Sequence, residues 1–117
     1  MVVRGRVVFE WILGGAYLLQ RSEMEHPAFP SSHSVIGLDE SSEHFAMYYF
    51  DSRGVTRRYE MDVSDGVWRI WRDAPAFSQR FTATFGDDGN AITGNWELST
   101  DGTRWEHDLA LTYTRAR

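Results

Sequence analysis

The chain of 117 residues contains no cysteine, only three prolines and no long apolar run. Without cysteine it has no disulfide, no thiolate zinc site and no cysteine nucleophile. No apolar run approaches the roughly 20 residues that a membrane-spanning helix needs. Positions 1–6 lack the apolar core of a signal peptide. These absences predict a cytoplasmic protein with no membrane partner.

Basic residues are outnumbered by acidic ones, 12 to 17. The formal net charge is -5, and nucleic-acid binding requires a basic face, so we expect no nucleic-acid partner. The hydrophobic share of 42% is sufficient for a packed core and argues against disorder. The length suits a single domain over residues 1–117.

Apolar and polar residues alternate along most of the chain, which is typical of strands. Turn signals such as Ser64-Asp65-Gly66 and Thr100-Asp101-Gly102 separate these segments. The predicted strands are 2–12, 16–24, 33–38, 44–50, 55–63, 67–72, 77–85, 91–98 and 105–113. Their short links favour an up-and-down order over Greek keys. The sequence therefore predicts an all-β, antiparallel meander β-barrel of about nine strands.

The last predicted strand places one ionisable ring among apolar residues. Trp105, Leu109, Leu111 and Tyr113 share a phase, and His107 falls in it. The alternation therefore predicts that the His107 imidazole points at the core. An imidazole there would act as a ligand's hydrogen-bond partner, as a general base, or as a core residue bonded to a neighbour.

Other polar residues also fall in apolar phases. Arg57 shares a phase with Tyr59 and Met61, and an inward arginine would hold a carboxylate, whereas the reverse phase would leave it in solvent. Gln20 and Gln79 need partners if buried. The candidate ligand-binding residues are His107, Arg57, Tyr59, Tyr49, Gln79, Gln20 and Trp96.

The same alternation predicts which side chains form the core. Trp68 and Trp71 fall in opposite phases, so one of them should be exposed or cover an end of the barrel. Thr82 and Thr84 should point away from the core. The side chains expected to be nearly buried are Phe81, Phe85, Trp96, Leu98, Leu109 and Leu111.

Four short blocks carry a family resemblance. They are Gly15-Ala16-Tyr17-Leu18, Tyr49-Phe50-Asp51-Ser52-Arg53-Gly54 followed by Tyr59, Gly94-Asn95-Trp96, and Trp105-Glu106-His107-Asp108. Together they resemble the uncharacterised DUF1579-type family, which is related in fold to the lipocalin and fatty-acid-binding calycins.

The resemblance implies a calycin-like barrel that binds a small, mostly apolar molecule, with an anionic or carbonyl group directed at Arg57, Tyr59 and His107. Such barrels are expected to begin with a Gly-x-Trp strand, and this sequence starts inside a strand at Val2. Either this start is too late, or the barrel lacks this first strand and is open at that edge.

Two alternatives involve chemistry at His107. Nitrobindin-like haem barrels hold iron through a histidine in the last strand, at a position similar to His107, although their glycine-rich opening motif is absent here. The first alternative is therefore haem binding with His107 as axial ligand; otherwise no cofactor is expected. The second is a small barrel enzyme of the cyclase or isomerase type. The chain has no Gly-x-Ser-x-Gly elbow and no metal-ligand histidine spacing. A packed interior that leaves only the surface for function is the remaining reading.

The first predicted strand has no upstream partner in the sequence. It should either pair with 105–113 to close the barrel or present an edge to a second copy. A homodimer through an edge strand is the expected assembly in the second case.

Overall fold

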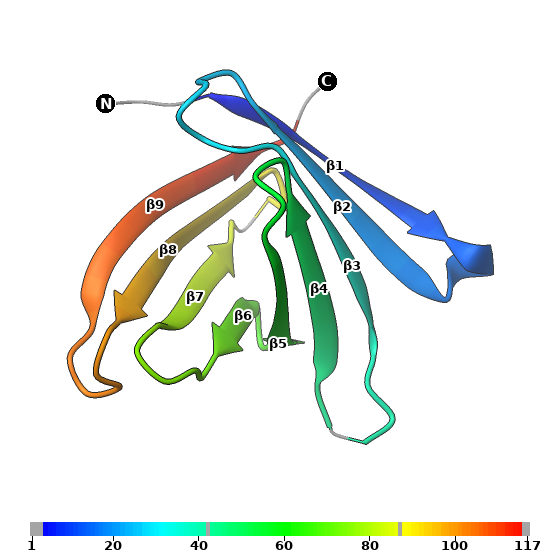
Figure 1. Cartoon of the computed structure of the whole chain (residues 1–117). Coiled ribbons are helices and arrows are strands. Elements are labelled where there is room, and N and C mark those ends of the chain that lie inside the picture. Colours follow the sequence, from blue (N-terminus) through cyan, green and yellow to red (C-terminus); the bar gives the residue numbers. More distant parts are fainter. Residues whose placement is uncertain (1–3, 42, 87, 116–117) are drawn as a thin grey trace. The chain divides into compact units, whose positions relative to one another are not determined.

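The computed structural model describes residues 4–41, 43–86 and 88–115, and these residues form nine strands and one short 3-10 turn (Figure 1). The elements are β1 (Gly5–Ile12), η1 (Leu13–Gly15), β2 (Tyr17–Met24), β3 (Ser32–Leu38), β4 (Phe45–Asp51), β5 (Thr56–Ser64), β6 (Val67–Arg72), β7 (Ser78–Phe85), β8 (Ala91–Ser99) and β9 (Glu106–Thr114). Val2 and Val3, where the first strand was predicted to begin, lie outside the described residues.

The strands follow one another in the order β1-β2-β3-β4-β5-β6-β7-β8-β9, and their described pairings are antiparallel. The prediction of an all-β antiparallel meander of about nine strands is therefore confirmed. The turn between β5 and β6 illustrates how tight turns that can be recognised in the sequence make consecutive strands neighbours. Asp65 and Gly66 both have positive φ, 53° and 74°, as a tight two-residue hairpin turn requires.

The chain forms two compact units that divide inside β5, between Tyr59 and Glu60. In the C-terminal unit, the residues in register across β5 to β9 are Met61, Ile70, Phe81, Trp96 and Leu109. We call the side of the sheet that carries this row the Phe81 face. Side chains in register share one side of a sheet, so this face holds the core of the unit.

Phe81 is the centre of that core and is 1% exposed. Its ring lies 5.1 Å from that of Trp68 and 5.1 Å from that of Trp96. Gly94 lies beneath it, where a Cβ atom would come within 2.6 Å of the ring. The absence of a side chain at Gly94 therefore lets Phe81 pack against the backbone of β8.

The predicted phase of β7 is confirmed, since Thr82 and Thr84 are exposed. Trp68 and Trp71 lie on opposite faces, because Trp68 pairs with Ala83 and Trp71 with Arg80. Trp68 is buried and Trp71 is half-buried, so neither is exposed. The prediction that Phe85 is buried is wrong. Phe85 is 41% exposed because it is the last residue of β7, and the pairing with β6 ends at Val67 and Thr84, so no β6 side chain in register lies beside it. Four other residues that were expected to be nearly buried are only half-buried: Trp96, Leu98, Leu109 and Leu111.

In the N-terminal unit, two rows of paired residues run across β2, β3 and β4. An apolar row consists of Leu18, Ile36 and Met47, and a polar row consists of Gln20, Ser34 and Tyr49. Both rows lie on one side of the sheet, because their positions in each strand differ by two. We call this side the Tyr49 face. Among the residues that the structure describes, no helix has the length and apolar character needed to cross a membrane.

Candidate functional site

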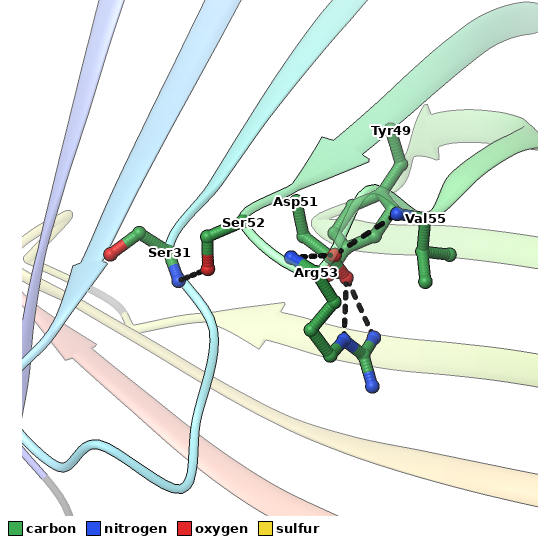
Figure 2. Close-up of polar contacts among 6 residues, drawn as sticks. All are labelled: Ser31, Tyr49, Asp51, Ser52, Arg53 and Val55. Carbon is green, nitrogen blue, oxygen red and sulfur yellow. Dashed lines mark hydrogen bonds and ion pairs between the residues drawn. The ribbon is translucent and has the colours of Figure 1, made fainter.

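A polar cluster of the N-terminal unit surrounds the Asp51 carboxylate at the end of β4 (Figure 2). Its Oδ1 accepts backbone N–H groups from Arg53 at 2.9 Å and Val55 at 3.3 Å. Its Oδ2 accepts the Tyr49 hydroxyl at 2.8 Å and the Arg53 guanidinium at 2.6 and 3.2 Å. The side chain of Asp51 is 0% exposed. Both oxygens are therefore fully engaged within the protein.

These contacts fix the ionisation of the cluster. Hydrogen bonding from Arg53, then from Tyr49 and the backbone, holds the pKa of Asp51 well below its usual range. Burial, reinforced by the bond to the Asp51 carboxylate, raises the pKa of Tyr49 to about 12. At neutral pH the carboxylate is charged and the phenol is neutral. The cluster thus holds the β4–β5 turn in place through hydrogen bonds. In this state, neither Asp51 nor Tyr49 is suited to donate or accept a proton in a reaction.

A second contact ties this turn to the chain that enters β3. Ser52 Oγ accepts the Ser31 N–H at 3.2 Å, and the Ser52 N–H donates to the Ser31 carbonyl at 2.9 Å. Two hollows border this link. One of about 380 Å³ is lined by Ser31, Ser32, His33, Phe50, Asp51 and Ser52. The other, of about 450 Å³, is lined by residues 24–31 with Ser52 and Arg53. In both hollows, the Ser31–Ser52 link and the Asp51–Arg53 pair supply polar groups that already bond one another.

The stability of the fold at acid pH should depend on the Asp51 cluster. A carboxylate with a depressed folded pKa contributes stability above its unfolded pKa of about 3.9, and the contribution is lost as pH falls toward the folded pKa. We therefore expect Asp51→Asn to lower the melting temperature at pH 7 and to flatten its decline below pH 4. Thermal melts against pH measure both effects. Asp73→Asn, at an exposed position, is the matched control. If the melting temperature of Asp51→Asn followed that of wild type at every pH, the stabilising role of the Asp51 cluster would be contradicted.

Several predicted site residues of the N-terminal unit come together on the Tyr49 face. Gln20 is half-buried in register with the buried Ser34, which pairs with Tyr49. The ring of Tyr59, 3% exposed, lies edge-on to Tyr49 at 6.2 Å. Arg57 precedes Tyr59 by two residues on β5, so it shares that face, and it is half-buried. The shared phase predicted for Arg57, Tyr59 and Met61 is confirmed.

His107 does not lie where the sequence predicted. In β9, Leu109 pairs with Trp96 but His107 pairs with Glu97, so Asp108 is the extra residue of a β-bulge. The bulge reverses the alternation, so that His107 falls on the side opposite Leu109. His107 is exposed, and its Nε2 lies 3.3 Å from Asn95 Oδ1. The prediction that this imidazole points at the core is therefore wrong.

The surroundings of His107 form a charged surface. Arg80 donates to both oxygens of Glu97, at 3.0 and 3.3 Å, and its guanidinium lies 4.0 Å from the centre of the Trp105 ring. Hydrogen bonding from Arg80, together with its positive charge and a smaller electrostatic contribution from His107, lowers the pKa of Glu97. This side of the C-terminal unit therefore carries an ion pair between Arg80 and Glu97, which contrasts with the apolar Phe81 face.

The Phe81 face contains a buried polar atom that sequence reasoning did not identify. Trp68 is 4% exposed, and its indole Nε1 is buried with no hydrogen-bond partner among the described residues. Its ring lies 6.3 Å from that of Tyr113, whose pKa is raised by burial. Two predicted site residues, Gln79 at 9% exposure and the half-buried Trp96, are on the same face. A buried donor without an acceptor costs about 1–3 kcal/mol and calls for a partner.

Some site residues that were not predicted from the sequence have weak signals in it. Ser34 alternates with Ile36 in the third strand, and Asp51 lies two residues from Tyr49, so their shared face was readable. The missing partner of Trp68 depends on side chains from other strands, and no local pattern indicates it. Among the described residues, no three histidine or acidic side chains gather as a metal site would require. A scan against protein-family models and a search of curated proteins find no match to this chain.

Proposed function

We propose that the protein binds a small, mostly apolar molecule that carries a hydrogen-bond acceptor, such as a carbonyl or carboxylate group, on the Phe81 face. The acceptor would take the hydrogen bond of the Trp68 indole N–H. This proposal agrees with the small-molecule binding that the resemblance to calycin-type barrels implies. It moves the contact of the ligand's polar group from Arg57, Tyr59 and His107 to Trp68.

The observation that carries the proposal is the unpartnered Trp68 donor in an apolar setting. On the same face, Phe81 is fully buried, whereas Trp96, Leu109 and Leu111 are only half-buried and keep part of their surface exposed. Aromatic and aliphatic side chains with one or two polar groups are the usual composition of a small-molecule site. The half-buried residues would supply the apolar contact, and Trp68 would fix the orientation of the ligand.

A pair of probes that differ only in the acceptor tests this proposal. Benzophenone carries a ketone, and diphenylmethane has a methylene group in its place. We expect calorimetric titration to give tighter binding of the ketone to the wild-type protein, by about tenfold, because only the ketone accepts from Trp68. In Trp68→Phe, which keeps an aromatic ring and removes the N–H, that advantage should disappear. The comparison cancels general effects of the substitution on the site.

Two control variants separate this site from the residues first suggested by the sequence. Arg57→Gln and His107→Phe should leave the ketone advantage intact, because the proposal assigns the acceptor to the Trp68 N–H and the bulge places His107 on the side of β9 opposite Leu109. Loss of the advantage in either variant would show that the acceptor binds elsewhere. Titration with a fatty acid, a flavonoid and haemin widens the search. A Soret shift abolished by His107→Phe would favour the haem alternative, and no saturable binding by any probe would favour a packed interior.

A further inference from the structure

β1 is an edge strand of the N-terminal unit, with β2 along one side, and it is the first member of the strand order. Large apolar side chains on and beside it are exposed: Phe9 by 44%, Trp11 by 71% and Leu13 by 75%. An edge strand with exposed apolar side chains is a template for pairing with another strand. The open edge of β1 is therefore suited to pair with a strand of another chain.

The hydrogen bonds to β2 determine which backbone groups of β1 face its open side. The Glu25 N–H donates to the Arg4 carbonyl at 2.9 Å, so Arg4 and every second residue after it turn their backbone groups toward β2. The residues whose backbone groups face the open side are Gly5, Val7, Phe9 and Trp11. An antiparallel strand added there must pair these residues with one another, which restricts the allowed registers.

We propose that two copies of the chain form a dimer by antiparallel pairing of their β1 strands, with the two-fold axis at Val8. In this register Val8 faces Val8 of the second copy, and Arg6 faces Glu10 in both directions. Opposite charges that face each other across an antiparallel pair stabilise it. The strand is thus complementary in charge to a second copy of itself, as a symmetric interface requires.

The side chains on the other face of β1 fit the same register. Phe9 would face Val7, and Trp11 would face Gly5 of the second copy, where the Met24 side chain lies over the glycine. An aromatic ring beside a glycine and a thioether gains contact that the single copy leaves exposed. The pairing would therefore cover the most exposed aromatic side chain of the unit, Trp11.

Neighbouring registers are less favourable. An axis at Phe9 would place Arg6 opposite Ile12 and Glu10 opposite Val8, which leaves both charges without a partner across the pair. An axis at Val7 would place Arg4 opposite Glu10 but Arg6 opposite Val8, which leaves the Arg6 charge without a partner across the pair. Within one copy, Glu10 lies 3.5 Å from Arg21, and both side chains are about half exposed, at 46% and 44%. Glu10 can therefore accept a second arginine.

A cysteine at the proposed axis gives the first test, because the native chain has none. Val8 would face Val8 as a non-hydrogen-bonded pair, with Cα atoms about 4.5 Å apart, which suits a disulfide. Under mild oxidation, Val8→Cys should therefore form a covalent dimer much faster than Glu10→Cys on the same side of the strand. Equal rates, or a Val8→Cys protein that stays monomeric, would overturn the proposal.

A charge exchange tests the same register without a covalent bond. Sedimentation velocity should show wild-type dimers of the 13.5 kDa chain. Arg6→Glu should raise the dimer dissociation constant by about tenfold, because Glu10 would then face a like charge twice. The double variant Arg6→Glu with Glu10→Arg should restore dimerisation, while Arg4→Glu, the matched control, should change it little. A monomeric wild type, an Arg4→Glu effect equal to that of Arg6→Glu, or failure of the double variant to restore dimers would overturn the proposal.

Discussion

Replacing Phe81 with alanine is expected to lower the free energy of unfolding by about 3–5 kcal/mol. Phe81 is 1% exposed and packs between Trp68 and Trp96, so its removal leaves a cavity that the flanking rings fill only in part. Chemical denaturation followed by circular dichroism measures the change. Leu109→Ala is the matched control on the same face. Leu109 is only half-buried, so its truncation should cost clearly less.

Equal losses for the two variants would contradict the position of Phe81 at the centre of the core. Such a result would mean that the row from Met61 to Leu109 is buried evenly. Because Trp68 contacts Phe81, the same variant should also change the near-ultraviolet spectrum of the tryptophans. Thr82→Ala, on the exposed side of the same strand, should leave both stability and spectrum close to wild type.

The second large effect is expected at Gly94, where alanine should destabilise the fold by about 1–3 kcal/mol. A Cβ atom there would lie 2.6 Å from Phe81 Cζ and 2.7 Å from Ala83 Cβ. Neither neighbour has a flexible end that moves aside. The measurement is again denaturant unfolding, with Asn95→Ala, at the exposed neighbouring position, as control.

The two substitutions should also be coupled. Removing the Phe81 ring opens the space that a Cβ at Gly94 needs, so Gly94→Ala should cost much less in the Phe81→Ala background. Strictly additive losses would contradict the close packing of the Phe81 ring on Gly94.

Much of the fold was predictable because its signals are local. Turns such as Asp65-Gly66 place the strand ends, and alternation placed Thr82 outside and Phe81 inside. The short links between strands fixed their order. These features each depend on a few consecutive residues, so a single sequence contains them.

The errors have a different origin. The bulge at Asp108 inserts one residue into β9, and no residue type marks its place, so the phase read from Leu109 placed His107 on the wrong side. Exposure at the end of β7 similarly depends on what covers Phe85 from other strands. On the Tyr49 face, the sequence suggested Tyr49 and Gln20 as ligand contacts, whereas the Tyr49 hydroxyl is committed to Asp51. Site geometry thus depended on contacts between strands that alternation does not encode.

The proposal of a ligand site on the Phe81 face is tested most directly by the nuclear magnetic resonance signal of the Trp68 indole N–H. The chain has five tryptophans, and Trp68→Phe identifies the signal by its loss. During titration with benzophenone, this signal should move downfield as the ketone accepts its hydrogen bond, while diphenylmethane should leave it near its original position. A Trp68 signal that stays in place, while signals around His107 or Tyr49 move with saturable binding, would contradict the proposed site.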